Sequence, residues 1–140
     1  MRKSTRTLLA FDETQQESID QIKRALADNS GPEMSNREFF LLALGLGFES
    51  DVEVETFKRS NNGVRLEYFK EEDTMLMAAV HLHKSKNPES LLDIEAIYNS
   101  AETYAAGGVK LLVEALNQSQ DLRIWLQARV KSAFEGLQSE

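Results

Sequence analysis

The stretch Phe39-Phe40-Leu41-Leu42-Ala43-Leu44-Gly45-Leu46-Gly47-Phe48 decides the fold, because it forms a helical segment that is apolar nearly all the way round. Ser35 and Glu38 open it as a capping box, in which each side chain satisfies a free backbone N–H. A helix without a polar face has to be covered on all sides. The cover is expected from the C-terminal part of the chain, from a second copy or from a partner protein. The residues expected at such an interface are Phe39, Phe40, Leu42, Leu44 and Leu46.

Residues 4–11 upstream of this helix favour a short strand, and an amphipathic helix follows in which Ile19, Ile22 and Leu26 share one face. Gly31-Pro32 is a stop signal for that helix. The order strand, helix, helix over residues 4–48 resembles the ribbon-helix-helix family. That resemblance implies a homodimer whose paired strands enter the DNA major groove and whose second helices form the dimer core. A helix-turn-helix core with a basic N-terminus explains the same pattern, so both readings stay open.

The charge distribution limits where DNA could be bound. The chain has 140 residues and a net charge of −7, and its first ten residues hold Arg2, Lys3 and Arg6 with no acid, so the remaining 130 residues carry −10. An acidic body opposes non-specific attraction to phosphates. DNA contact is therefore expected only at local basic elements. The candidate DNA-binding residues are Arg2, Lys3, Thr5, Arg6 and Thr7 at the N-terminus, with Lys58 and Arg59 further along.

The middle of the chain predicts a β-hairpin over about residues 52–69. Apolar and charged residues alternate on both sides of Asn62-Gly63, a dipeptide typical of hairpin turns. Helical apolar spacing dominates after residue 70, and Gly107-Gly108 is expected to break one of these helices. The predicted fold is mainly α. It has a ribbon-helix-helix-like module over residues 1–50, and a hairpin plus a C-terminal helical bundle over residues 51–140, packed as one unit with it.

The residues offer little for catalysis. Without cysteine, the chain has no disulfide, thiol nucleophile or thiolate-based metal site. His81 and His83 point about 200° apart on a helix, so they cannot bind one metal from the same face. No phosphate-binding glycine loop and no nucleophile motif occurs. We therefore expect no enzyme, no cofactor, no metal and no small-molecule substrate. No signal peptide and no membrane-spanning stretch are recognised, and a cytoplasmic location is expected.

Three segments carry a second resemblance. They are the apolar run ending in L-G-F at residues 46–48, V-R-L-E-Y-F at residues 64–69, and A-E-T-Y-A-A-G-G-V-K-L-L at residues 101–112. Residues 36–116, which contain them, are similar to the Dnd-system-associated protein four family. Dnd systems put phosphorothioates into DNA and restrict DNA that lacks them. The resemblance implies a small accessory component of a prokaryotic DNA-modification or anti-phage defence locus, without enzymatic activity.

Three functions remain as alternatives. The first is an accessory or adaptor subunit that binds itself, as a homodimer or higher oligomer, and larger proteins of a defence complex, with DNA as a further candidate ligand. The second is a homodimeric ribbon-helix-helix regulator bound to an operator. The third is an acidic inhibitor that occupies the nucleic-acid site of an enzyme. The acidic composition and the over-apolar helix favour the first.

Overall fold

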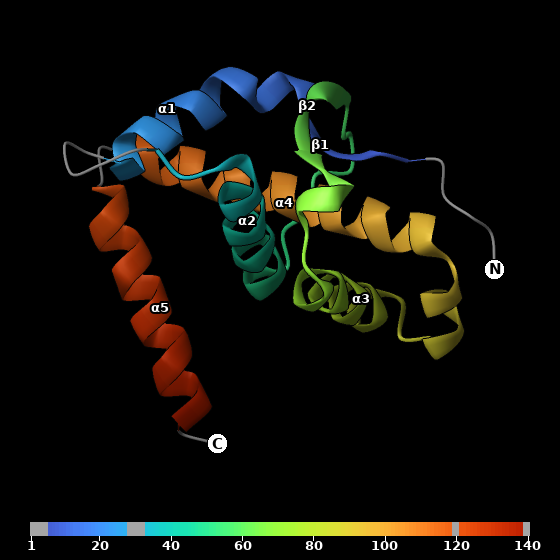
Figure 1. Ribbon diagram of the computed structural model, residues 1–140. Helices are drawn as coiled ribbons and strands as arrows, with labels where there is room; N and C mark the ends of the chain where they lie inside the picture. Colours follow the sequence, from blue (N-terminus) through green and yellow to red (C-terminus); the bar gives the residue numbers. More distant parts are fainter. Residues whose placement is uncertain (1–5, 28–32, 119–120, 139–140) are drawn as a thin grey trace.

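The computed structural model describes residues 6–27, 33–118 and 121–138, with side chains up to residue 132 in the last range. Figure 1 shows that helices make up most of it, so the prediction of a mainly α fold is confirmed. The strands are β1 (Leu8–Asp12) and β2 (Arg59–Arg65). The helices are α1 (Gln16–Ala27), α2 (Asn36–Ser50), α3 (Glu71–Ser85), α4 (Ile94–Asn117) and α5 (Leu122–Gln138), with short 3-10 turns at Glu13–Gln15, Leu66–Tyr68 and Pro88–Leu92.

Helix α4 is the central element of the molecule. It runs across the body with α1 on one side and α2 and α3 on the other (Figure 1). Ala101, Ala105, Val109 and Leu112 lie on its buried face, each at most 2 % exposed. These residues recur every three or four positions, and the neighbouring residues Tyr104, Ala106, Gly107 and Gly108 are buried too, so α4 is covered on more than one side.

Glycines let α2 and α4 approach to backbone contact. A Cβ added to Gly47 would lie 1.9 Å from the Tyr104 carbonyl oxygen, and one added to Gly108 would lie 1.8 Å from the Ala43 carbonyl oxygen. A Cβ on Gly107 would meet the Val52 carbonyl oxygen at 1.8 Å. The expected helix break at Gly107-Gly108 is therefore wrong, since both glycines lie inside a continuous α4. Packing against neighbouring backbone outweighs their low helix propensity.

The chain itself covers the apolar helix α2. Phe39, Phe40 and Leu44 are fully buried, Leu46 is 6 % exposed, and Leu42 is half-buried. The Phe11 ring packs at 5.9 Å from that of Phe39 and 6.1 Å from that of Phe40. Phe39, Phe40, Leu44 and Leu46, which are expected at an interface, lie in the core instead, because α4 and β1 provide the cover. Leu42 packs against that core and stays half-buried.

The two strands form an antiparallel pair in the register Leu8↔Arg65, Leu9↔Val64 and Ala10↔Gly63. The predicted hairpin over residues 52–69 is therefore wrong, since Asn62 and Gly63 lie inside β2 and Gly63 pairs with Ala10 of the N-terminal strand. Gly63 is needed there because a Cβ would lie 2.1 Å from the Leu9 carbonyl oxygen. The order strand, helix, helix is present over residues 8–50, but β1 pairs with β2 of its own chain rather than with a second copy.

No helix in the described ranges is both long enough and apolar enough to cross a membrane.

Candidate functional site

Two of the candidate DNA-binding residues, Arg6 and Arg59, meet at the carboxylate of Glu102 in α4. Arg6 Nη1 donates to Oε1 at 3.1 Å, and Arg59 Nη1 donates to both carboxylate oxygens at 2.8 and 2.6 Å. The backbone N–H of Ala10 donates to Oε2 at 2.7 Å. Glu102 is 2 % exposed, so this is a buried carboxylate with charged and neutral donors. We call these four residues the Glu102 cluster.

Further contacts hold Arg6 inside the fold. Its Nη2 donates to Asn99 Oδ1 at 2.6 Å and lies 3.1 Å from Glu95 Oε2, and its guanidinium lies 5.8 Å from the centre of the Tyr98 ring. The Arg6 side chain is only 12 % exposed. A DNA phosphate would have to compete with these acceptors. The geometry therefore favours a structural role for Arg6, which links the segment before β1 to α4.

Burial and pairing have opposite effects on the pKa of Glu102. Burial raises the pKa of Glu102 above its ordinary value, while the Ala10 N–H and the two guanidinium groups oppose that shift. Removing either arginine would leave an under-compensated buried charge, which is costly in the low-dielectric interior. The cluster therefore fixes the N-terminal strand and β2 against α4.

The remaining candidate DNA-binding residues are spread over the surface or lie outside the described residues. Lys58 is exposed and sits 3.6 Å from Glu13 Oε2. Thr7 is exposed, and its carbonyl accepts the Leu66 N–H at 2.9 Å. Arg2, Lys3 and Thr5 fall outside the described ranges. The structure thus brings Arg6 and Arg59 together, but both bind the Glu102 carboxylate of their own chain.

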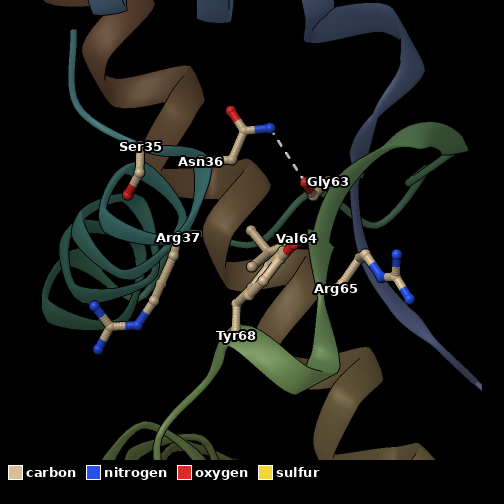
Figure 2. Close-up of a pocket in the computed structure, with 7 residues that line it drawn as sticks. All are labelled: Ser35, Asn36, Arg37, Gly63, Val64, Arg65 and Tyr68. Carbon is tan, nitrogen blue, oxygen red and sulfur yellow. Dashed lines mark hydrogen bonds between the residues drawn. The ribbon is translucent and has the colours of Figure 1, made fainter. Parts of the chain in front are cut away.

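A cleft with a volume of about 590 Å³ lies between the start of α2 and β2 (Figure 2). The Asn36 side-chain amide donates to the Gly63 carbonyl oxygen at 3.2 Å and links the two walls. Figure 2 shows the Tyr68 ring lying beside Val64 between these walls, and Tyr68 is 61 % exposed. The residues that line the cleft are Ser35, Asn36, Arg37, Gly63, Val64, Arg65 and Tyr68.

Both arginines of this cleft are paired. Arg37 donates from Nε and Nη2 to Asp73 Oδ2 at 3.0 and 2.8 Å, and the Lys70 N–H donates to the same oxygen at 2.8 Å. Burial would raise the pKa of Asp73, but these hydrogen bonds outweigh it and hold the pKa below its ordinary value. Arg65 Nε lies 2.6 Å from Glu67. Figure 2 shows the two guanidinium groups pointing away from each other, so the middle of the cleft is a tyrosine ring on an apolar wall, suited to receiving a side chain.

His81 and Ser100 form a histidine–serine contact of the kind that nucleophilic catalysis uses. Its Nδ1 lies 2.7 Å from Ser100 Oγ, and its Nε2 has no hydrogen-bond partner in the described structure. Burial lowers the pKa of His81. Nucleophilic catalysis would need an accessible hydroxyl, and Ser100 is only 3 % exposed. The pair therefore packs α3 against α4, and within the described ranges no three potential His, Asp or Glu ligands gather for a metal.

Sequence reasoning missed Glu102, Asp73 and His81 as organising residues. For Glu102 the sequence does hold a signal, because this acid interrupts a run of small residues in the apolar stripe of α4. An acid in such a stripe requires buried donors. His81 has no comparable signal, since its partner Ser100 lies on α4. Asp73 accepts the N–H of Lys70, three residues upstream, but its charged partner Arg37 lies on α2.

The comparisons place the chain in a family. The sequence profile of DNA sulphur modification system-associated protein 4 matches residues 10–134. The predicted resemblance over residues 36–116 is confirmed, and the match extends it to the last residues of β1 and to most of α5. No curated protein and no solved structure gives a significant match. Because the profile covers well over half of its length, the chain belongs to the DNA sulphur modification system-associated protein 4 family.

Proposed function

We propose that this protein is a non-enzymatic accessory component of a DNA sulphur-modification system that acts through contacts with other proteins of the system. The family match over residues 10–134 carries the proposal, since the family is defined by association with such a system.

The Glu102 cluster supports contacts with protein over contacts with DNA. Among the candidate DNA-binding residues that the structure describes, Arg6 and Arg59 both bind Glu102, at 3.1 Å or less. The net charge of −7 adds repulsion from phosphates at long range. The exposed Tyr68 in the cleft beside β2 has the character of a contact residue for protein, because tyrosine is enriched at such interfaces.

The test is co-expression of the tagged protein with the modification and restriction proteins of its own locus, followed by size-exclusion chromatography at low and moderate salt. We expect a defined complex with at least one of them that persists at moderate salt. Tyr68→Ala should weaken the complex. Lys58→Ala, which changes an equally exposed side chain outside the cleft, should leave it intact.

The opposing outcome is DNA binding by the isolated protein. Fluorescence anisotropy with short duplexes should show no association at moderate salt. A salt-sensitive affinity that is lost in an Arg2→Ala, Lys3→Ala double variant, together with no complex in the co-expression experiment, would overturn the proposal and restore the regulator reading.

A further inference from the structure

The exposed large apolar side chains of the described structure gather around two helices. Tyr68, Met75, Leu76 and Leu92 lie on or next to α3, and Ile124 and Val130 lie on α5. Single exposed apolar residues need no explanation, but groups on one helix face mark contact surfaces.

The first surface, here called the α3 face, consists of Glu72, Met75, Leu76 and Ala79. Met75 is 65 % exposed and Leu76 is 44 % exposed, and the other two are also exposed. Residues three and four apart share one side of a helix, so these four form a continuous strip. Glu71 and Glu72 make its N-terminal end acidic.

The second surface, here called the α5 face, consists of Ile124, Gln127, Val130 and Lys131. Ile124 is 65 % exposed and Val130 is 67 % exposed. A hollow of about 430 Å³ lies here, lined by Leu126, Gln127, Val130 and Lys131. The far side of α5 is occupied by its own chain, where Arg129 donates to Ser50 Oγ at 2.9 Å and its guanidinium lies 4.6 Å from the centre of the Trp125 ring.

The two faces are complementary in charge, spacing and size. Glu72 and Ala79 are seven residues apart, as are Ile124 and Lys131, so each face spans about 10.5 Å along its helix. Antiparallel packing brings Glu72 opposite Lys131. It also brings the small Ala79 opposite the large Ile124. Met75 and Leu76 then meet Val130 and Gln127, so that three apolar side chains and one amide pack between a charged pair and a small–large pair.

One chain cannot join its own two faces, because α2 lies between α3 and α5 (Figure 1). Both helices nevertheless extend to the same side of α4 (Figure 1). We propose that α5 of one copy docks antiparallel on the α3 face of a second copy, and that the same contact is repeated about a two-fold axis. Such an arrangement closes on itself, because the two-fold axis pairs the α3 face of each copy with α5 of the other and leaves neither face open.

The experiment measures mass by light scattering and dimer dissociation by analytical ultracentrifugation on the full-length protein. We expect a dimer for the wild type. Val130→Glu should weaken it by about 100-fold or more, since it buries a carboxylate at both contacts. Glu72→Lys should weaken it by about tenfold through repulsion from Lys131. The double variant Glu72→Lys, Lys131→Glu should recover the wild-type affinity.

Leu92→Glu is the matched control. Leu92 is 68 % exposed, like Val130, but lies outside both faces. It should leave the dimer unchanged, and circular dichroism should confirm that all variants are folded. A wild type that stays monomeric at all concentrations would refute the proposal. So would a dimer insensitive to Val130→Glu, or a double variant weaker than either single charge reversal.

Discussion

Two glycines on α2 should respond in opposite ways to the same substitution. Gly47 faces α4, and a Cβ there would lie 1.9 Å from the Tyr104 carbonyl oxygen. Gly45 is exposed and would meet nothing within 4 Å. The pair separates intrinsic helix propensity from helix–helix contact, because both residues lie on the same helix.

The magnitudes follow from this geometry. Gly45→Ala should raise the free energy of unfolding by about 0.5 to 1 kcal/mol through helix propensity alone. Gly47→Ala has the same gain, but ordinary contact starts at 3.4 Å, so the Tyr104 backbone would have to retreat by 1.5 Å. Overpacking of this kind costs about 1 to 3 kcal/mol or more, and here it acts on backbone rather than on a flexible side chain. Gly47→Ala should therefore lose about 2 kcal/mol net.

Urea denaturation followed by circular dichroism measures both effects. The midpoint should rise for Gly45→Ala and fall for Gly47→Ala with little change in the denaturant slope. Thermal melting should shift in the same directions, by roughly 3 to 5 °C per kcal/mol. If Gly47→Ala stabilised the protein as much as Gly45→Ala, the backbone contact between α2 and α4 would not exist.

Three further predictions concern buried ionisable groups. Glu102→Ala should cost about 3 kcal/mol of unfolding free energy, because it removes the buried carboxylate that binds both Arg6 and Arg59 while Arg6 keeps its ion pair with Glu95. Chemical denaturation measures this loss, and a value near zero would contradict the role of the cluster. The folded-state pKa of Asp73 lies below the ordinary 3.8, so its contribution to stability is present at neutral pH and is lost as the pH falls through that folded pKa. The melting temperatures of the wild type and of Asp73→Asn should therefore differ at neutral pH and converge in acid. A difference that stays the same at every pH would contradict this assignment. Burial and the Asp51 hydrogen bond raise the pKa of Tyr104 to about 12, so stability should fall as the pH rises from 10 towards 12. Tyrosinate absorbance should show a step near pH 12 that Tyr104→Phe removes, and persistence of that step in the variant would refute the assignment.

The helices could be predicted because their signals are local. Ser35 and Glu38 form the capping box read from the sequence, with Ser35 Oγ accepting the Glu38 N–H at 3.1 Å. The apolar spacing around Ile19 and Ile22 likewise marked α1, where both residues are buried. Such patterns need only one turn of chain to be read.

The strand pairing and the site could not be predicted, because their causes are distant in sequence. Asn62-Gly63 is typical of a hairpin turn, yet an apolar N-terminal strand competes for the same residues, and Val64 pairs with Leu9. The sequence makes Arg6 and Arg59 candidate DNA-binding residues, because nothing nearby in sequence shows that Glu102 binds both. The low helix propensity of Gly107 and Gly108 predicts a break in α4 for the same reason. The contacts that keep the helix continuous there come from the distant backbone of Ala43 and Val52.

The Glu102 cluster has a consequence for synthesis on the ribosome. Ala10 and Glu102 are 92 residues apart, so the first strand leaves the ribosome long before the carboxylate that holds it. At bacterial and eukaryotic elongation rates this delay is roughly 5 to 20 s. During that interval Leu9 and Phe11 have no α4 to cover them, and in its first part they also have no β2. The nascent chain therefore presents an apolar segment to chaperones and to neighbouring chains. Folding of this protein is therefore expected to finish only after α4 has been made.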